Sequence, residues 1–272
     1  MYDKDIEVFI VGDSYAEGLC ENENNDIAGH LRSSKVKALN LGITGSGPLV
    51  SLAVIREYLE KFNPNYVVYL YFEGNDLKDL EWEENTYLRN YLKKDFRFDY
   101  LEKLNDIKFF LENFEIDRNL TIRKLSKFDK EEIRTKKDYL ETLKDILEIS
   151  NIKGILRSSL IKNEDNIDIN LFFQIIETMN KDVKEKNSEL IFVYLPSWSR
   201  YFTKFNEDKF LFNKKNEIIN FVKNNDITFI DFETQLNDSK NIKSYFPLGY
   251  IGHYNSNGYK KISDLIREKI HN

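Results

Sequence analysis

The sequence has very little cysteine and no long apolar run. Cys20 is the one cysteine among 272 residues, so no disulfide can form within the chain. No stretch reaches the roughly 20 apolar residues that a membrane-spanning helix needs. The first apolar run begins shortly after Met1, and no signal-peptide pattern precedes it. We therefore expect the chain as given to be soluble, either cytoplasmic or an excerpt of a longer protein whose targeting or membrane segment is missing.

Positive charge and metal-binding side chains are also scarce. Lys and Arg number 40 against 46 Asp and Glu, which gives a net charge of −6 and a pI near 5.4. Such a chain has no general attraction for nucleic acid or anionic lipid, so small molecules or neutral glycans are the expected partners. The three histidines and Cys20 are not closely spaced, and no phosphate-binding loop or dinucleotide fingerprint is present. We expect no metal and no cofactor.

The composition is that of a globular protein with a well solvated surface, with 41% hydrophobic, 14% aromatic and 32% charged residues. The length suits one large α/β domain, 1–272, and permits an insertion within it. Short apolar runs bounded by turn residues predict five strands. These strands cover residues 7–11, 36–41, 66–72, 190–195 and 227–232.

Helical patterns alternate with these runs, at residues 26–32, 48–62, 171–185, 209–223 and 258–270. Alternating strands and helices predict a five-stranded parallel sheet covered on both faces, in a three-layer, flavodoxin-like arrangement. In such folds the reactive groups gather at the carboxyl ends of the strands. The residues that follow each strand are therefore the first candidates for a functional site.

The interval between residues 72 and 190 is far longer than one crossover helix needs. Apolar residues recur there at helical spacing, as in Leu104, Ile107 and Leu111. We predict a mainly helical insertion at residues 83–166. It could form a cap over the strand ends or only pack on the domain, and the pattern favours neither alternative.

Four candidate chemical groups stand after predicted strands or before the last helix. Ser14 follows the first strand in the sequence Gly-Asp-Ser-Tyr. The second strand leads into a loop at Gly42, where glycine lets backbone amides face a ligand. Asn75 follows the third strand, and His253 precedes the final helix. Each signal is weak by itself because Ser and Asn are common turn residues, but their joint placement at one sheet edge favours a catalytic site.

The same blocks, in the same order, resemble those of the SGNH (GDSL-like) hydrolase superfamily. The likeness covers residues 7–76 and 190–270 but not the predicted insertion. It implies Ser14 as the nucleophile and His253 as the general base and then acid. It also implies three oxyanion donors, namely the backbone N–H groups of Gly42 and Ser14 and the side-chain amide of Asn75.

A narrower likeness is carried by the segments GDSY, NLGITGSGP, YFEGND and GHYNSNGY. They look like the SGNH domains of bacterial envelope-glycan esterases and O-acyltransferases. The resemblance implies a serine esterase or O-acyltransferase that forms an acyl-serine and acts on O-acyl groups, in the first place O-acetyl groups, of a carbohydrate. An acyl donor would then be a further partner, and the chain could be an excerpt of an envelope-associated protein.

The sequence departs from the family pattern at one position. The family usually has an aspartate three residues before the histidine, and here that position is Tyr250. An imidazole needs an acceptor in the right place to orient it, and that acceptor need not be charged. We predict that the backbone carbonyl of Tyr250 accepts the ring N–H of His253. A carboxylate from elsewhere in the chain is the alternative.

Three further residues are candidates for supporting roles. Asp13 precedes the nucleophile and is expected to support it, whereas Tyr15 and Trp198 are candidate substrate contacts. For Trp198, packing is the favoured role. Two other functions stay open: a lipase-like or thioester hydrolase that uses the insertion as an acyl groove, and a glycan-binding module that keeps the fold but has lost turnover.

Overall fold

The computed structural model describes residues 5–22, 24–94, 96–99, 169–202, 209–250 and 252–271. Within them, five parallel strands form one sheet with the order β2-β1-β3-β4-β5. The strands are β1 (Val8–Gly12), β2 (Ala38–Asn40), β3 (Tyr66–Phe72), β4 (Glu189–Leu195) and β5 (Thr228–Asp231). This is the flavodoxin-like order, and it reverses between β1 and β3. The predicted five-stranded parallel sheet is confirmed.

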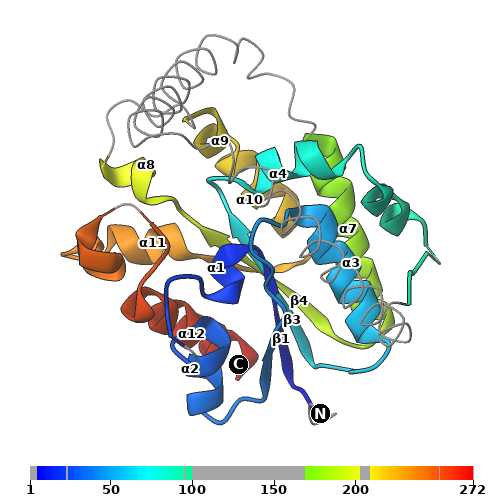
Figure 1. Cartoon of the computed structure of the whole chain (residues 1–272), viewed down its shortest axis with the longest axis horizontal. Coiled ribbons are helices and arrows are strands. Elements are labelled where there is room, and N and C mark those ends of the chain that lie inside the picture. Colours follow the sequence, from blue (N-terminus) through cyan, green and yellow to red (C-terminus); the bar gives the residue numbers. More distant parts are fainter. Residues whose placement is uncertain are drawn as a thin grey trace, which may run out of the picture. The chain divides into compact units, whose positions relative to one another are not determined.

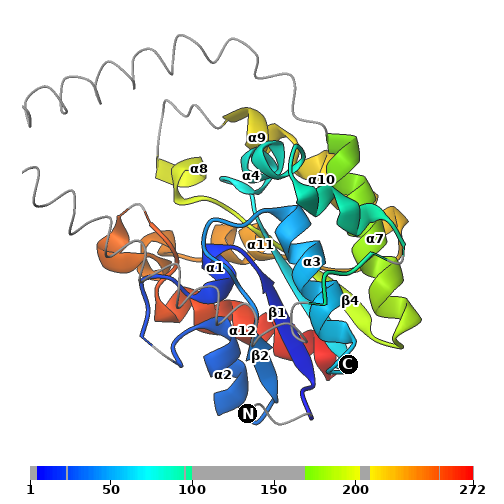
Figure 2. The same ribbon diagram turned by 45° about the vertical axis from the view of Figure 1, so that its right-hand side comes forward.

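The side chains of β1 alternate between two separate cores. Val8 and Ile10 belong to one buried cluster, and Phe9 and Val11 belong to the other. A strand that is buried on both faces reads as an unbroken apolar run, which explains the pattern in the sequence. Both faces of the sheet must therefore be covered by helices, as Figures 1 and 2 show.

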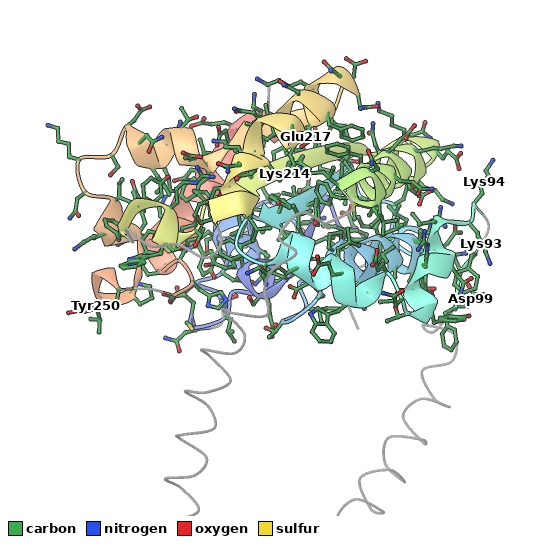
Figure 3. All side chains as sticks on the ribbon, turned by 90° about the horizontal axis from the view of Figure 1, so that it is seen from above. Lys93, Lys94, Asp99, Lys214, Glu217 and Tyr250 are labelled. Carbon is green, nitrogen blue, oxygen red and sulfur yellow. The ribbon has the colours of Figure 1, made fainter. Side chains whose placement is uncertain are left out.

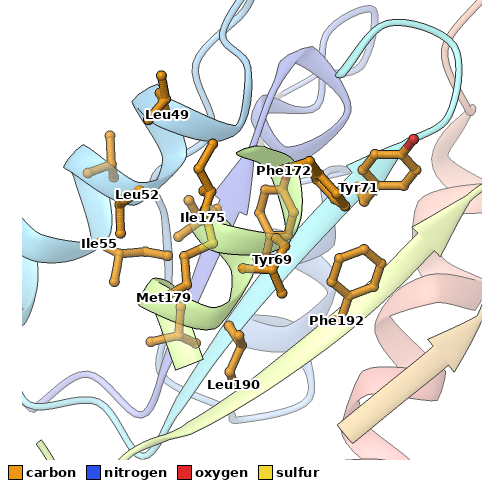
Figure 4. Close-up of a cluster of buried hydrophobic side chains, with 14 of the residues drawn as sticks. Leu49, Leu52, Ile55, Tyr69, Tyr71, Phe172, Ile175, Met179, Leu190 and Phe192 are labelled. Atoms are coloured by element: carbon orange, nitrogen blue, oxygen red, sulfur yellow. The ribbon is translucent and has the colours of Figure 1, made fainter. Parts of the chain in front are cut away.

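One face carries α3 (Pro48–Leu59), α7 (Ile169–Glu185), α9 (Lys209–Asn213) and α10 (Lys215–Asn224). Figure 4 shows the centre of this core, where α3 and α7 meet β3 and β4 through Leu52, Ile55, Ile175, Met179, Tyr69 and Phe192. The predicted helix at 209–223 is divided in two. The N–H of Lys214 bonds to the carbonyl of Leu211, three residues back, so the helix tightens and ends there before α10 begins.

The opposite face carries α2 (Ile27–Ser33), α11 (Phe232–Asn237) and α12 (Ser256–Ile270). Tyr254 anchors the start of α12 in this core, because its ring is buried and its hydroxyl donates to the carbonyl of Pro196. Shorter elements lie in the connections: α1 (Ser14–Glu17), α4 (Asp76–Glu83), η1 (Tyr87–Leu92), α8 (Trp198–Phe202), η2 (Ile242–Tyr245) and η3 (Pro247–Gly249). The described helices include none with the length and apolar character of a membrane span.

The start of the predicted insertion at Glu83 needs correction. Glu83 is the last residue of α4 and is buried, and the chain up to Phe98 belongs to the same compact unit as the sheet. Tyr91 of η1 is also buried, and its carbonyl accepts a hydrogen bond from Arg56 of α3. The helical pattern predicted within 100–166 falls outside the described residues, and its role as a cap stays a prediction.

Candidate active site

Ser14 stands at the turn between β1 and α1, at the carboxyl end of the strand. Gly12 has a φ of +150°, and a Cβ on it would lie 2.7 Å from the carbonyl oxygen of Leu70, so glycine permits the close passage of β1 past β3. The Asp13 carboxylate then caps α1 by accepting the N–H of Tyr15 at 2.8 Å. Ser14 is the first residue of α1 and is 8% exposed.

The imidazole of His253 meets the hydroxyl of Ser14. Nε2 lies 2.7 Å from Oγ, although the two residues are 239 positions apart in the sequence. Burial lowers the pKa of His253 below its ordinary value of 6.5. The ring is therefore neutral at pH 7, which is the state that can accept a proton from a hydroxyl.

Tyr15 supports the His253 ring from within the protein. It stacks on Phe72 with the ring centres 3.9 Å apart, and its centre lies 4.5 Å from that of His253. Its hydroxyl donates to the carbonyl of Gly252 at 3.2 Å. Because Tyr15 is only 5% exposed, the structure gives it a packing role beside the imidazole instead of the predicted substrate contact.

The predicted acceptor for His253 is not found at Tyr250. Among the described residues, the hydrogen-bond partner of Nδ1 is Cys20, whose Sγ lies 3.9 Å away, and no hydrogen bond joins the ring to the Tyr250 carbonyl. The Tyr250 side chain is 70% exposed, and Figure 3 shows it at the edge of the molecule. The φ of +53° at Leu248 and +73° at Gly249 turns the chain sharply just before Tyr250. Such φ values are not readable from residue types.

The side-chain amide of Asn75 lies on the other side of Asp13. Its Nδ2 donates to Asp13 Oδ2 at 3.2 Å, and its Oδ1 is buried without a partner in the described structure. The same Asp13 oxygen is 3.5 Å from Ser14 Oγ, farther than His253 Nε2 is. Burial raises the pKa of Asp13, and the Tyr15 N–H and the Asn75 amide oppose that rise. Asp13 thus links Ser14 and Asn75 across β1 and β3.

The structure gives Gly42 a different role from the predicted one. Its N–H donates to Asn40 Oδ1 at 2.9 Å, so this donor is already engaged. A Cβ on Gly42 would lie 2.2 Å from the backbone nitrogen of Glu17, which means that glycine is needed here for close packing against α1. The predicted oxyanion role of Gly42 therefore lacks a free donor.

Gly45, in the same loop, was missed by the sequence argument. The chain beyond β2 continues along β1, because the N–H of Ile43 donates to the carbonyl of Gly12. Gly45 comes after this stretch with a φ of +75°, has open space around the position of a Cβ, and its N–H has no hydrogen bond within the described structure. The hydroxyl of the neighbouring Ser46 donates to the carbonyl of Gly12, at the end of β1, at 3.3 Å.

A row of carboxyl groups follows Asn75 along α4. Burial, and then the charge of Asp13, raises the pKa of Asp76 well above its ordinary range. Burial also raises the pKa of Asp79 to about 6 and that of Glu83 to about 7. Glu83 accepts the N–H groups of Gly47 and Leu49, so it caps α3 and fixes the end of the glycine-rich loop. These groups shape the loop and are not in hydrogen-bond contact with Ser14.

Trp198 makes internal contacts. Its ring packs on Phe202, with the centres 4.9 Å apart, and its Nε1 donates to the carbonyl of Gly249 at 3.3 Å. Nearby, the buried carboxylate of Glu73 is paired with Arg200 and accepts the N–H of Ser197 at 2.8 Å, so the loops after β3 and β4 are joined. In the described part of the chain, no group of three or more His, Cys, Asp or Glu side chains could hold a metal ion.

Comparison with known proteins identifies the fold. No family model matches the sequence, and no curated protein matches it. An acetyl xylan esterase structure matches with a TM-score of 0.54 and 12% identity over 97% of this chain and 100% of the other. A GDSL-like lipase from Bacteroides thetaiotaomicron VPI-5482 matches with a TM-score of 0.51 and 14% identity over 98% and 88%. A lipase/acylhydrolase from Enterococcus faecalis matches with a TM-score of 0.51 and 12% identity over 98% and 95%. The chain has the fold of the GDSL (SGNH) hydrolases, as its sequence motifs predict.

Proposed function

We propose that this protein is a serine hydrolase or acyltransferase that acts on esters through an acyl-Ser14 intermediate. The observation that carries the proposal is the 2.7 Å contact between Ser14 Oγ and His253 Nε2 at the carboxyl end of β1. A serine hydroxyl is a poor nucleophile near neutral pH unless a neighbouring base takes its proton. The lowered pKa of His253 keeps that base neutral and ready.

In the proposed reaction, Ser14 Oγ forms a bond to the carbonyl carbon of the ester while its proton moves to His253 Nε2. The tetrahedral intermediate then collapses, the ester C–O bond breaks, and His253 returns the proton to the departing alcohol oxygen. Water or a sugar hydroxyl next attacks the carbonyl carbon of the acyl-Ser14 while His253 takes its proton; the bond from that carbon to Ser14 Oγ then breaks, and His253 returns the proton to Oγ. Hydrolysis and transfer differ only in this last acceptor.

The negative charge that develops on the carbonyl oxygen needs donors already in place. We assign this role to the Ser14 N–H, the Asn75 amide and the N–H of Gly45. Gly45 replaces Gly42 in this assignment because the Gly42 N–H is bonded to Asn40 and that of Gly45 has no partner in the described structure. Asn75 Nδ2 carries two hydrogens, so it can donate one to Asp13, which holds the amide next to Ser14, and the other to the carbonyl oxygen of the ester.

For the substrate, we propose the O-acyl groups, in the first place O-acetyl groups, of a carbohydrate. The sequence segments around Ser14, Gly42, Asn75 and His253 resemble those of envelope-glycan esterases and O-acyltransferases. An acetyl xylan esterase, whose substrate is an acetylated glycan by name, shares the fold. Both observations concern other proteins and support the choice of substrates to test.

A second candidate, a lipase-like or thioester hydrolase, is favoured by exposed apolar side chains on the segments that flank the site. Leu19 follows α1 and is 40% exposed, Ile43 follows β2 and is 45% exposed, and Leu248 precedes His253 and is 93% exposed. Exposed apolar side chains on segments that adjoin the site residues suit an acyl chain longer than acetyl. Rates on p-nitrophenyl esters from acetate to decanoate separate the two candidates: a maximum at acetate supports the glycan esterase, and a maximum at octanoate or beyond supports the lipase.

The proposed function is tested by labelling with a fluorophosphonate probe, followed by intact-mass and peptide mass spectrometry. We expect one adduct on Ser14, no adduct on Ser14→Ala, and an adduct on Ser263→Ala, a matched control at a second buried serine on α12. Acetylated oligosaccharides, with and without a free acceptor sugar, then distinguish hydrolysis from transfer. Binding of such glycans without labelling or turnover would instead identify an inactive glycan-binding module and refute the proposal.

A further inference from the structure

The side chain of Cys20 faces the outer nitrogen of the His253 ring. Its Sγ lies 3.9 Å from Nδ1, while Nε2 of the same ring contacts Ser14 Oγ at 2.7 Å. No carboxylate hydrogen-bonds to this ring within the described residues, and burial is the cause of its lowered pKa. Ser14, His253 and Cys20 thus form a continuous chain of contacts in which sulfur occupies the third place.

The segment around Cys20 is attached to Ser14 and to the start of the helix that follows His253. The N–H groups of Gly18 and Leu19 donate to the carbonyl of Ser14 at 3.1 and 3.0 Å. On the other side of Cys20, Glu21 Oε1 accepts the N–H of Ser256 at 2.7 Å, at the start of the helix that follows His253. Because one side is held by Ser14 and the other by Ser256, the position of the sulfur is coupled to that of the imidazole.

The proposed reaction needs an acceptor at this place. For Nε2 to take the proton of Ser14, the hydrogen of the neutral ring must sit on Nδ1, where it requires a partner to hold the tautomer and the ring plane. A thiol sulfur is a weak acceptor, and 3.9 Å is a long contact even for sulfur. The effect of such a partner on rate should therefore be modest compared with that of a carboxylate.

We propose that Cys20 is a positioning residue for His253, accepting the Nδ1–H where the resembling hydrolases use an aspartate. The inference rests on the proposed function, since it presumes that His253 acts as a base. It also makes Cys20 an exposed site at which thiol modification slows the enzyme.

Variants at position 20 test the role of the sulfur. Cys20 has a φ of +77°, a region that Asp and Asn tolerate better than most residues, so Cys20→Asp and Cys20→Asn compare a carboxylate and an amide on the same backbone. We expect Cys20→Ala to lower kcat/KM on p-nitrophenyl acetate about three- to tenfold with KM within about twofold, the range of one neutral hydrogen bond. We expect kcat/KM of Cys20→Asp to be about tenfold or more above that of Cys20→Asn, because a carboxylate stabilises the imidazolium.

The pH profile separates positioning from a merely structural effect. A carboxylate next to the ring raises the pKa of His253, so the midpoint of the kcat/KM profile should move to higher pH in Cys20→Asp than in Cys20→Ala. A change in folding stability alone would not move this midpoint. Two results together would overturn the proposal. One is that Cys20→Ala and the unmutated protein have equal kcat/KM, and the other is that the pH profiles of Cys20→Asp and Cys20→Ala have equal midpoints.

A test on the unmutated chain avoids any folding defect. Methyl methanethiosulfonate transfers a methylthio group to a thiol and releases methanesulfinate, and Cys20 is the one cysteine available. We expect this modification to slow fluorophosphonate labelling of Ser14 by about threefold or more, dithiothreitol to restore the rate, and Cys20→Ala to be insensitive. If Ser14 is labelled at the same rate before and after modification, the role of Cys20 is refuted and the proposed function stands. If Ser14 is never labelled, both fail.

Discussion

Glu83 offers a prediction whose magnitude follows from the structure. Its carboxylate is buried at the N-terminus of α3, where it accepts the N–H groups of Gly47 and Leu49 at 2.6 and 2.8 Å, and burial raises its pKa from 4.5 to about 7. In the unfolded chain this group releases its proton near pH 4.5, and in the folded protein near pH 7. Between these values the folded state binds more protons, so the free energy of unfolding falls as the pH rises.

The perturbation is Glu83→Gln, which keeps the shape of the side chain and removes the titrating proton. The rise in the pKa of Glu83 from 4.5 to about 7 corresponds to about 3 kcal/mol in the free energy of unfolding. We expect the free energy of unfolding of Glu83→Gln, relative to that of the unmutated protein, to rise by about this amount between pH 4.5 and pH 7.5. Glutamine has one carbonyl oxygen for two N–H groups, so a constant loss of about 1 kcal/mol is expected at every pH. Only the part that changes with pH tests the reasoning.

The assay is urea unfolding in steps of pH, followed by circular dichroism. Glu81→Gln is the matched control, because Glu81 stands on the same helix with its side chain exposed. The free energy of unfolding of this control, plotted against pH, should run parallel to that of the unmutated protein. If the difference between Glu83→Gln and the unmutated protein stays constant within about 1 kcal/mol across this range, the carboxyl is not destabilised by burial and the argument is wrong.

Three further predictions concern the site. Asn75→Ala should lower kcat about 10²- to 10³-fold with little change in KM, because its amide acts on the transition state, and a pure rise in KM would contradict this role. The rate of Ser14 labelling should increase with pH through a midpoint below 6.5, since burial lowers the pKa of His253, and a midpoint above 7 would exclude His253 as the base. Gly42→Ala should lower the free energy of unfolding by more than about 2 kcal/mol in urea, because its Cβ would meet the backbone of α1. Gly45→Ala has open space around its Cβ and should cost only the strain of a φ of +75°, about 1 kcal/mol. Equal losses would contradict the packing role of Gly42.

The sheet and its order of layers could be predicted from the sequence because the strands are buried on both faces. A run such as Val8 to Val11 has few stable positions other than the centre of a covered parallel sheet. The placement of Ser14 and Asn75 at one edge then follows from the direction of the strands, whereas His253 does not follow a strand and is placed by the loop before α12. The helix at 209–223 was predicted without its interruption, because the break at Lys214 arises from a backbone hydrogen bond and leaves no mark on apolar spacing.

The finer parts of the site depend on backbone dihedral angles, which residue types encode poorly. The loop contains Gly42, Gly45 and Gly47, and only the path of the chain past Gly12 decides which of them has a free N–H. The contact between Cys20 and His253 has no sequence signal either. It requires a positive φ at a non-glycine residue and a partner far along the chain.

The placement of Tyr15 has a consequence for how this fold can vary. Tyr15, which follows the proposed nucleophile Ser14 on α1, packs on the ring of the proposed base His253, so neighbouring residues of one short helix contact both ends of the Ser14–His253 hydrogen bond. The contacts among Ser14, Tyr15 and His253 involve no residue of the connection between β3 and β4. If Ser14 and His253 react as proposed, the separation of their reacting atoms is set near the two ends of the chain, and the length of the long connection between β3 and β4 does not enter it.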